Sequence, residues 1–407
     1  MSYIDTLLRG ADVEWKTLGD EVEIANIGVD KKINVNEAEV RLLNFVDVFK
    51  NQYISNATPT MVVTASERKI TDCNIKEGDV FITPSSELID EIGFSAMAIE
   101  DFNNAVYSYH IMRLRVNNKN VLFPAFLNYL FSSTNVRKQI RLKAQGITRF
   151  GLTQPNWKSL QIPIPTIEIQ QKIVDILDTF TELTAELTAE LTARKKQYTY
   201  YREQLLGYDE NEVEWKTLGE VCIKSYSGST PKAGNPRYYE NGTIPWLRTQ
   251  EVKFIDIYST EIKITETALA ETGAKWIPEN CVIIAISGAT AGRSGINKIP
   301  LTTNQHCCCL EINPKQALYK YVFYWVSLNY EKLKNSGQGA RGDINSGIIK
   351  SLQIPVPPIE EQERIVAILD KFDTLTTSIS EGLPKEIELR QKQYEYYREQ
   401  LLTFPKA

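Results

Sequence analysis

Apolar residues recur three or four positions apart in two long stretches, one near the middle of the chain and one near its end. The two sets are Ile173, Ile176, Leu177 and Phe180, and Ile365, Ile368, Leu369 and Phe372. Positions with this spacing lie on one face of an α-helix, so the pattern predicts two long amphipathic helices. Within the second, Gly382-Leu-Pro384 predicts a break or kink.

The first helix continues through Thr181–Ala193, where the four residues Thr-Ala-Glu-Leu repeat. Alanine, glutamate and leucine are strong helix formers, and the repeat places Leu183, Leu187 and Leu191 on one stripe. A helix over residues 166–206 would be about 60 Å long at about 1.5 Å per residue. The stripe needs an apolar partner, so we expect the two long helices to pack on each other or on another chain.

Shorter apolar runs before each helix predict globular domains with strands and helices. A turn signal at Lys76–Asp79 leads into the strand Val80–Ile82, and the second half has the apolar run Val282–Ile286. Amphipathic aromatic segments follow at Leu122–Phe131 and Leu318–Ser327, and we expect helices packed on a sheet. Two more pairs match at the offset between the strands (282 − 80 = 202), namely Ser85 with Ser287 and Gly93 with Gly295.

Three peptides occur twice. Val13–Gly19 (VEWKTLG) returns at 213–219, Ser159–Pro163 (SLQIP) at 351–355, and Gln197–Leu206 almost unchanged at 393–402. The offsets are 200, 192 and 196, so the chain consists of two copies of one unit. Each helix ends in paired leucines that lead into the start of a globular domain, so we expect the two ends of the chain to meet. The predicted fold is mixed α/β, with antiparallel helices in a pseudo-twofold, circular arrangement.

Composition suits this organisation. A chain of 407 residues accommodates two domains, and 43% hydrophobic and 24% charged residues are ordinary for a globular protein. Without a membrane-spanning apolar run or a signal peptide, we expect an intracellular, cytoplasmic protein. The consecutive Cys307–Cys309 predict a buried strand. With two histidines and no CxxC pair, we expect no metal site.

The net charge of −5 is unevenly distributed. No acidic residue occurs between Asp101 and Glu168, although this stretch contains nine arginines and lysines, whereas the acids gather in 166–214 and 359–399. Such segregation predicts a basic face for nucleic acid, with a chance asymmetry of solvated side chains as the alternative. The basic residues are Arg113, Arg115, Lys119, Arg137, Lys138, Arg141, Lys143, Arg149 and Lys158.

Catalytic motifs are missing. The sequence has no GxxxxGK[ST] loop and no strand-anchored GxGxxG, and two histidines do not readily build a catalytic triad. Asn235–Tyr238 is similar to the Asn-Pro-Pro-Tyr motif of amino-group methyltransferases, but Arg237 replaces the second proline and no AdoMet-binding loop precedes it. We therefore expect a protein that is not an enzyme on its own.

The motifs around the helices resemble those of the specificity subunit of bacterial type I restriction–modification systems. They are Gln161–Pro165 with Gln170-Gln171, Gln353–Pro357 with Glu361-Gln362, the two YYREQLL ends, Ser227–Pro231, Tyr238-Tyr239 and Ile244–Leu247. The Thr-Ala-Glu-Leu repeats resemble those of the IC subclass. The resemblance covers essentially the whole chain. It implies target recognition domains at 1–165 and 213–353, with helical spacers at 166–212 and 354–407.

The resemblance further implies a non-catalytic, sequence-specific DNA-binding subunit. Each recognition domain would read one half of a bipartite, asymmetric site in double-stranded DNA, and the helices would set the gap. The implied partners are two methyltransferase subunits and restriction/translocase subunits, so AdoMet, ATP and Mg²⁺ would belong to them and this chain would hold no cofactor. A coiled-coil scaffold or adaptor whose basic domains bind RNA or protein is the alternative.

Candidate DNA contacts are polar or basic residues of the two domains. Arg149 and Arg341 lie in glycine-containing loops, where an arginine either contacts phosphate, caps a helix or pairs with a carboxylate. The equivalence of Leu43 and Leu247 places Asn44 opposite Arg248, and asparagine suits adenine whereas arginine suits guanine. The full set is Asn44, Ser85, Ser86, Arg141, Lys143, Arg149, Lys232, Arg237, Tyr238, Arg248, Arg293, Asn297 and Arg341.

Overall fold

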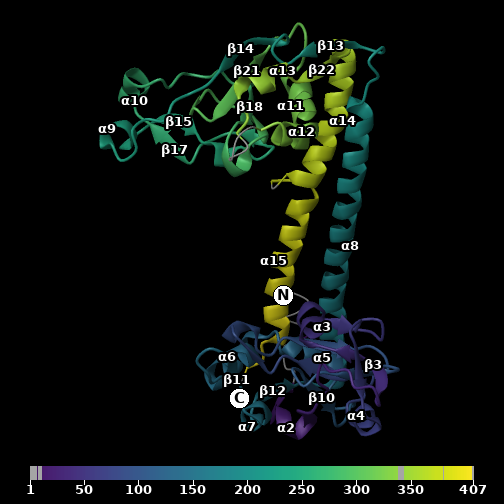
Figure 1. Ribbon diagram of the computed structural model, residues 1–407. Coiled ribbons are helices and arrows are strands. Elements are labelled where there is room, and N and C mark those ends of the chain that lie inside the picture. Colours follow the sequence, from purple (N-terminus) through teal and green to yellow (C-terminus); the bar gives the residue numbers. More distant parts are fainter. Residues whose placement is uncertain (1–6, 8–11, 338–342, 379, 406–407) are drawn as a thin grey trace. The chain divides into compact units, whose positions relative to one another are not determined.

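The chain divides into two compact units, each with a globular part and segments of the long helices (Figure 1). The computed structural model describes Leu7 and residues 12–337, 343–378 and 380–405. The first unit comprises Met1–Leu187 with Ile387–Ala407, and the second comprises Thr188–Glu386. Helix α8 (Ile167–Leu206) contributes to both, so this division cuts through the helices and does not separate globular from helical residues.

The first globular part contains a five-stranded and a three-stranded sheet. The larger has the order β2-β10-β6-β8-β4, and the smaller has the order β5-β3-β9. One face of the larger sheet packs on α5 and the start of α8, and the other face packs towards the smaller sheet. The strands are β2 (Val22–Ala25), β3 (Ala38–Leu43), β4 (Tyr53–Ile54), β5 (Val62–Ala65), β6 (Val80–Ile82), β8 (Ser95–Ala98), β9 (Ala105–Tyr107) and β10 (Met112–Val116). The helices are α2 (Leu18–Glu21), α3 (Phe45–Lys50), α4 (Glu67–Asp72), α5 (Pro124–Leu130), α6 (Thr134–Lys143) and α7 (Gln154–Lys158).

The second globular part repeats this topology. Its larger sheet has the order β14-β21-β18-β19-β16 and its smaller sheet the order β17-β15-β20. The prediction of two similar mixed α/β domains is therefore confirmed. The strands are β14 (Cys222–Tyr226), β15 (Ile244–Leu247), β16 (Asp256–Ile257), β17 (Ile262–Ile264), β18 (Val282–Ala285), β19 (Ser294–Asn297), β20 (Thr302–Thr303) and β21 (Cys307–Ile312). The helices are α9 (Pro236–Tyr239), α10 (Glu266–Glu271), α11 (Tyr319–Leu328), α12 (Tyr330–Asn335) and α13 (Ser346–Ser351).

Two of the repeated peptides are partners in the fold. β1 (Glu14–Thr17) pairs antiparallel with β12 (Gln161–Ile164), and β13 (Glu214–Thr217) pairs in the same register with β22 (Gln353–Val356). VEWKTLG and SLQIP thus form one small sheet in each unit. This sheet lies where the globular part meets its helix, which is why the two peptides recur together.

A buried glutamine attaches the helix to each globular part. In the first unit, the Gln170 amide accepts a hydrogen bond from Phe123 N and donates to Val121 O and Pro165 O, each at 2.8 Å. In the second unit, Gln362 makes the same three bonds, to Leu318 N at 2.9 Å, Gln316 O at 3.1 Å and Pro357 O at 2.8 Å. Neither glutamine is exposed to solvent.

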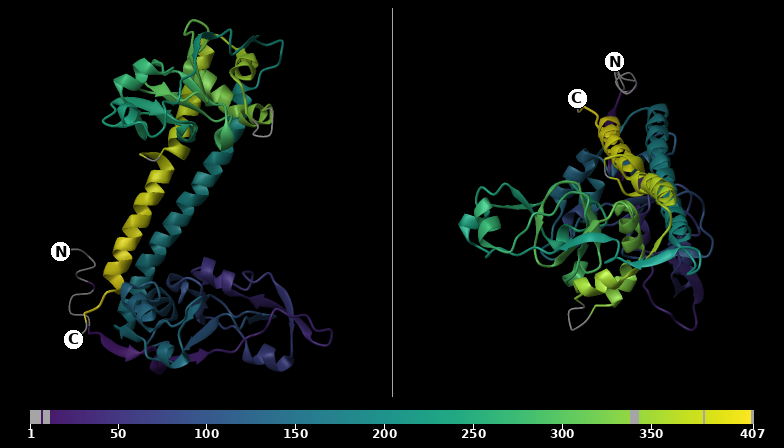
Figure 2. Two further views of the ribbon diagram at one scale, coloured as in Figure 1. Left: turned by 60° about the vertical axis from the view of Figure 1, so that its left-hand side comes forward. Right: turned by 90° about the horizontal axis from the view of Figure 1, so that it is seen from above.

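Antiparallel helix segments pack on each other within each unit. In the first, Phe180 of α8 stacks on Tyr397 of α15 (Gly382–Leu402), with ring centroids 5.4 Å apart. In the second, Tyr198 and Tyr201 of α8 stack on Phe372 of α14 (Ile359–Thr377), and Figure 2 shows these segments side by side. The prediction that the helices pack on each other is confirmed within each unit. Leu183, Leu187 and Leu191 are half-buried among exposed neighbours, as the stripe predicts.

The end of the chain closes the first unit. Leu401, Leu402 and Phe404 belong to its core, as Leu206 belongs to the core of the second unit. The Trp15 indole also donates to Pro405 O. The expected meeting of the N- and C-terminal segments is therefore confirmed.

The predicted break in the second helix is also confirmed. α14 ends at Thr377 and α15 begins at Gly382, whose φ of +80° is the left-handed conformation that glycine adopts most readily. The cysteine strand is confirmed as β21, with all three thiols buried. In the described part of the chain, no helix is both long and apolar enough to cross a membrane.

One predicted equivalence is wrong. Gly93 donates its N–H to Thr83 O at 2.8 Å, and in the second unit the corresponding bond runs from Gly292 to Ala285 O, also at 2.8 Å. Both glycines have positive φ angles, +77° and +86°. Gly93 therefore corresponds to Gly292 and not to Gly295, because the loop after β6 is three residues longer than the loop after β18 (93 − 83 = 10; 292 − 285 = 7).

Candidate nucleic-acid interface

In the two smaller sheets, the strands β3 and β15 end at structurally equivalent residues. β3 is parallel to β9, and Ser108 N donates to Leu43 O at 2.9 Å. β15 is parallel to β20, and Asn304 N donates to Leu247 O at 3.1 Å. Leu43 and Leu247 are thus structurally equivalent, as the sequence predicted.

The next residues, Asn44 and Arg248, are accordingly equivalent. The backbone N–H of each is held by a carboxylate three residues later, Asp47 at 2.9 Å and Glu251 at 3.0 Å. The side chains differ in their partners. Asn44 Oδ1 caps α3 by accepting from Val46 N, and the Arg248 guanidinium pairs with Glu251 and Glu261.

A second pair of equivalent segments lies against these strand ends. Val29 N donates to Tyr107 O at 2.9 Å, and Ser229 N donates to Thr303 O at 3.0 Å. The glycine before each of them allows this close approach, since a Cβ on Gly228 would lie 1.7 Å from Thr303 O. The equivalence does not extend to the next basic residues, because Thr64 N donates to Lys32 O whereas the matching Thr265 N donates to Tyr238 O. Lys32 and Lys232 are both exposed. Sequence reasoning selected Lys232 but missed Lys32.

The two histidines are a third equivalent pair. His110 N donates to Ser108 Oγ at 3.2 Å, and His306 N donates to Asn304 Oδ1 at 3.1 Å. His306 directly precedes β21 and His110 lies two residues before β10, the strands that pair with the central strands β18 and β6 of the larger sheets. Burial lowers the pKa of His110, and the nearby cations Lys31 and Arg149 lower it further, against the opposing effect of Asp30. Sequence reasoning missed both histidines because their equivalence depends on strand register.

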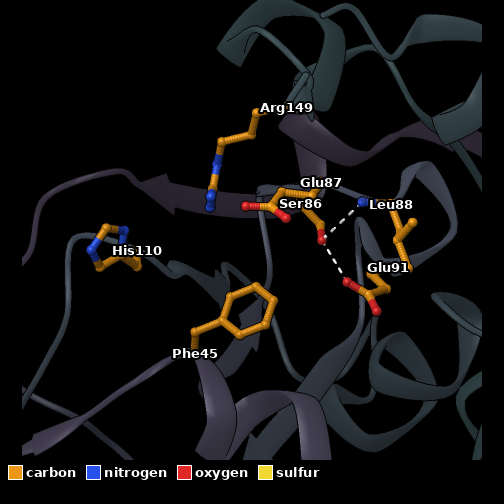
Figure 3. Close-up of a pocket in the computed structure, with 7 residues that line it drawn as sticks. All are labelled: Phe45, Ser86, Glu87, Leu88, Glu91, His110 and Arg149. Atoms are coloured by element: carbon orange, nitrogen blue, oxygen red, sulfur yellow. Dashed lines mark hydrogen bonds between the residues drawn. The ribbon is translucent and has the colours of Figure 1, made fainter. Parts of the chain in front are cut away.

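In the first unit these elements surround a cavity of about 440 Å³ (Figure 3). Arg149 Nε donates to Ser85 Oγ at 3.1 Å, where the strand β11 (Phe150–Gly151) pairs with β7 (Ser85–Ser86). Ser86 Oγ donates to Glu91 at 2.6 Å. The structure thus brings together two predicted residues, Ser86 and Arg149, with five that were not predicted. The lining residues are Phe45, Ser86, Glu87, Leu88, Glu91, His110 and Arg149.

The second unit places the corresponding loops together. Ile344 N donates to Ile286 O at 2.8 Å, and Gly288 N donates to Asp343 Oδ1 at 3.4 Å. Asp343 and Ile344 therefore approach the loop after β18, as 149–151 approaches Ser85. The predicted Arg341 lies outside the described residues. Arg293 is half-buried in the loop between β18 and β19.

Several other predicted residues already have partners within the protein. Arg237 and Tyr238 of α9 both contact Glu271, at 2.8 and 3.1 Å. On α6, Arg141 pairs with Asp90. Lys143 donates to Ser159 Oγ at 2.9 Å.

Asn297 requires a correction. Its side chain is completely buried and binds Cys281 N, Pro278 O and Ile299 O at 2.7–2.9 Å. The amide stabilises the turns beside β19 and is not available to DNA, so Asn297 is removed from the contact set.

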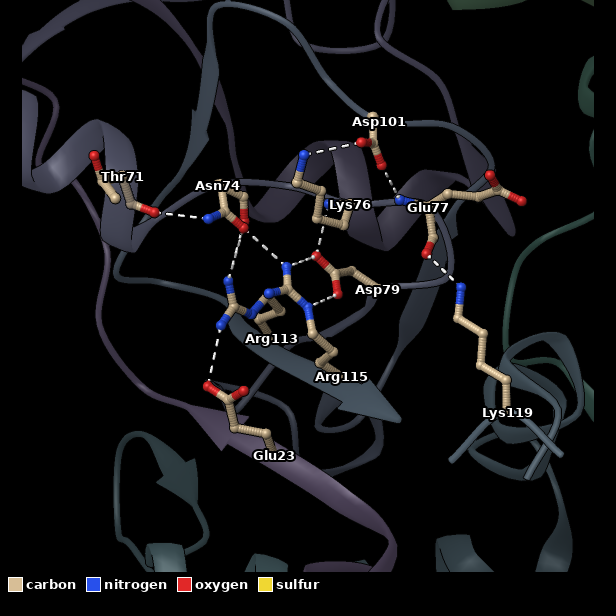
Figure 4. A network of polar contacts seen from close by, with 10 residues as sticks. All are labelled: Glu23, Thr71, Asn74, Lys76, Glu77, Asp79, Asp101, Arg113, Arg115 and Lys119. Carbon is tan, nitrogen blue, oxygen red and sulfur yellow. Dashed lines mark hydrogen bonds and ion pairs between the residues drawn. The ribbon is translucent and has the colours of Figure 1, made fainter. Parts of the chain in front are cut away.

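The basic run of the first half is largely structural (Figure 4). Arg115 forms two hydrogen bonds to Asp79 at 2.6 and 2.7 Å, and the buried Arg113 binds Asn74 and Glu23. Arg137 donates to the carbonyls of Ile92 and Asp90. Arg113 and Arg115 neutralise acids from distant parts of the sequence, which a count along the chain does not reveal. The basic face is therefore smaller than the charge pattern predicted.

The comparisons with known proteins agree with this architecture. A family model described as the type I restriction modification DNA specificity domain matches residues 11–194 and again residues 210–389. The chain is 36% identical over 422 residues to the type I restriction enzyme EcoR124I/EcoR124II specificity subunit of Escherichia coli, covering 100% of this chain and 98% of that protein. It is 31% identical to a putative type I restriction enzyme specificity subunit of Haemophilus influenzae, with 99% and 98% coverage.

Solved structures share the fold. The S subunit of a type I restriction–modification system from M. genitalium superimposes with a TM-score of 0.58 at 15% identity, covering 100% of both chains. A chain from a structure of type I R-M complex assembly gives a TM-score of 0.62 at 15% identity, covering 97% of this chain and 98% of that one. Nothing in these matches supports the scaffold or adaptor alternative. The two domain matches and the relatives similar over their whole length show that this chain belongs to the family of type I restriction–modification DNA specificity subunits.

Proposed function

We propose that this chain is the DNA-recognition subunit of a type I restriction–modification complex, in which each globular part reads one half of a bipartite, asymmetric site. The observation that carries the proposal is the set of equivalent positions built twice from the same backbone hydrogen bonds. Asn44 and Arg248, and His110 and His306, occupy these positions. Equivalent frames whose side chains differ at Asn44 and Arg248 favour two different half-sites.

Asn44 and Arg248 are the proposed source of one difference in base preference. An asparagine amide pairs with the N6 and N7 edge of adenine, and an arginine pairs with O6 and N7 of guanine. Each side chain has a partner in the protein that DNA would replace or share. For Arg248, the edge of a base could displace the carboxylate of the exposed Glu261 from the guanidinium.

Phosphate contacts are proposed for basic side chains around each frame, because such contacts position a protein on the duplex. Lys32 is 73% exposed at its side chain and its salt bridge with Asp30 is a surface pair, which costs little to break. Ser85 and Ser86 belong to the same face as Arg149. The full proposed set adds Arg141, Lys143, Arg149, Lys232, Arg237, Tyr238, Arg293 and Arg341.

The proposed partners follow from the family. The chain would recognise double-stranded DNA together with two methyltransferase subunits, and with restriction/translocase subunits where DNA is cleaved. It would contribute recognition without catalysis, in the cytoplasm. AdoMet, ATP and Mg²⁺ would be bound by those partners. Membership of the IC subclass remains a prediction that rests on the Thr-Ala-Glu-Leu repeats.

The helices are proposed to set the gap between the half-sites. α8 is one uninterrupted helix of 40 residues that includes all the repeats. Deleting one repeat, residues 188–191, removes four residues and shortens the helix by about 6 Å. Base pairs rise by about 3.4 Å, so we expect the half-sites to stay the same and the gap to shrink by one or two base pairs.

Mapping methylated adenines in a host that expresses the chain with its methyltransferase partners measures both quantities. Ala189→Ser is the matched control, because it changes an exposed residue of the same repeat without changing the helix length. A changed half-site with an unchanged gap would refute the proposed role of the helices. Loss of every defined methylated motif in the control would instead show that the assay does not report on this chain.

A further inference from the structure

The only two histidines of the chain occupy equivalent positions in the two globular parts. They are 196 residues apart, and the same offset relates the residues that position them, Ser108 and Asn304. Ser108 N and Asn304 N in turn bind the carbonyls of Leu43 and Leu247. Each histidine therefore lies two residues after the residue that bonds to the end of β3 or β15, where Asn44 or Arg248 follows.

In the first unit, His110 lies among residues of the proposed DNA face. It lines the same cavity as Phe45, Ser86 and Arg149 (Figure 3). Its ring packs against that of the exposed Tyr109, with centroids 3.9 Å apart and the planes tilted by 38°.

In the second unit, His306 is exposed and has polar neighbours. Its Nε2 lies 3.2 Å from Nε2 of Gln305, whose Oε1 accepts a hydrogen bond from Thr230. Thr230 lies two residues before Lys232 in the chain. The same frame thus surrounds His306 with uncharged polar groups and His110 with charged ones.

We propose that His110 and His306 are base-reading residues, one for each half-site. The proposal rests on the proposed function and extends it to two residues that nothing else assigns. An imidazole N–H can donate to N7 of a purine, and its second nitrogen can accept from an exocyclic amine. Such contacts depend on the identity of the base, whereas contacts to the phosphate backbone do not.

A base contact fits His110 better than a phosphate contact. The lowered pKa of His110 favours the neutral ring at neutral pH, and a neutral ring attracts phosphate far less than the adjacent lysines do. Lys31, whose charge lowers the pKa of His110, and the exposed Lys32 already provide cations for the DNA backbone. The imidazole can then form hydrogen bonds to the edge of a base.

The test uses the full chain purified with its methyltransferase subunits, comparing His110→Ala and His306→Ala with the parent. We expect each variant to relax discrimination at one base pair of its own half-site, with about a tenfold loss of affinity for the parent site. The readouts are the methylated motif in cells and binding to duplexes altered one position at a time. His110→Gln and His306→Gln retain a donor and an acceptor and should shift the preference at that same position.

Matched controls exist at the other end of the same two strands. Lys119 and Lys315 follow β10 and β21 at the same offset of 196, and both are exposed. Lys119 of the predicted basic run donates to Glu77 O at 3.1 Å, and neither lysine belongs to the proposed contact set. Lys119→Ala and Lys315→Ala should leave motif and affinity unchanged. Thermal unfolding of every variant should stay close to that of the parent, since His306 is exposed and His110 is only half-buried.

Two results would overturn the proposal. One is an unchanged motif and affinity in both alanine variants, and the other is an equal weakening for every DNA sequence, which would make the histidines backbone contacts. Lys32→Ala and Lys232→Ala test the proposed function separately from the histidine proposal, because both lysine variants should weaken binding to every DNA sequence. If the lysine variants also bind DNA like the parent, the proposed face itself is wrong and the histidine proposal fails with it.

Discussion

Replacing Gln170 by alanine should destabilise the first unit strongly. The side chain is completely buried and makes three hydrogen bonds of 2.8 Å to the backbone. These bonds join the loop before α5, the end of β12 and the first turn of α8. Alanine removes all three and leaves the N–H of Phe123 and the carbonyls of Val121 and Pro165 without this partner.

The expected magnitude follows from these groups. A hydrogen bond of this kind contributes about 1 kcal/mol net, whereas a buried donor left without a partner costs about 1–3 kcal/mol. Removing the buried atoms also leaves a small void. The sum is about 3–5 kcal/mol, which is a large fraction of the 5–15 kcal/mol or so that stabilises a typical domain. Most of the loss should appear where α8 attaches to its globular part.

Hydrogen exchange read by mass spectrometry distinguishes the two units in the full chain. We expect Gln170→Ala to raise exchange in α5 and the start of α8, and Gln362→Ala to act in the same way on α11 and α14. Gln171→Ala is the matched control, because it changes the same residue type one position along the helix at an exposed site. Equal denaturation midpoints for Gln170→Ala and Gln171→Ala would refute the role assigned to the buried amide.

Two further predictions concern single positions. Gly382→Ala should lower the free energy of unfolding by about 1–3 kcal/mol, because the φ of +80° disfavours alanine and its Cβ would lie 2.4 Å from Thr374 O. Chemical denaturation measures this free energy. A loss below about 0.5 kcal/mol would contradict the prediction. Asn44→Ser should preserve the cap of α3 and hence thermal stability, while altering the first half-site of the methylated motif at one base pair. Asn44→Arg should shift the preference at that base pair towards guanine. An unchanged motif in both variants would contradict base reading by Asn44.

The helical and repeated parts were predictable because their signals are local. The spacing of Ile173, Ile176, Leu177 and Phe180 fixes a face of α8, and Gly382 marks the start of α15. Recurrence of VEWKTLG and SLQIP was evident from the letters alone. Their pairing in one sheet was not, because strands that are about 150 residues apart carry no local record of their partner.

The site was predictable only in part, because exposure and charge partners depend on the folded chain. Arg113 and Arg115 read as a basic face in sequence, yet they bind Glu23 and Asp79 from other strands. Asn297 has the side chain of a base-reading residue, yet it is buried at 0% exposure and bridges two turns. A constant offset also failed where loops differ in length, which is why Gly93 was matched to the wrong glycine.

The frame around Asn44 and Arg248 explains how two similar units can read different bases. At both positions the backbone N–H is held by a carboxylate three residues later, Asp47 or Glu251, and not by the side chain at the position itself. The carbonyl of the preceding leucine is held by the backbone of Ser108 or Asn304. Because these bonds fix the Cα without using the side chain at 44 or 248, that side chain can change from a neutral amide to a guanidinium while the strand end stays in place. The same reasoning applies to the histidines, whose backbones are held by the residue two positions earlier, and it assigns base preference to side chains that can be exchanged while these backbone positions stay fixed.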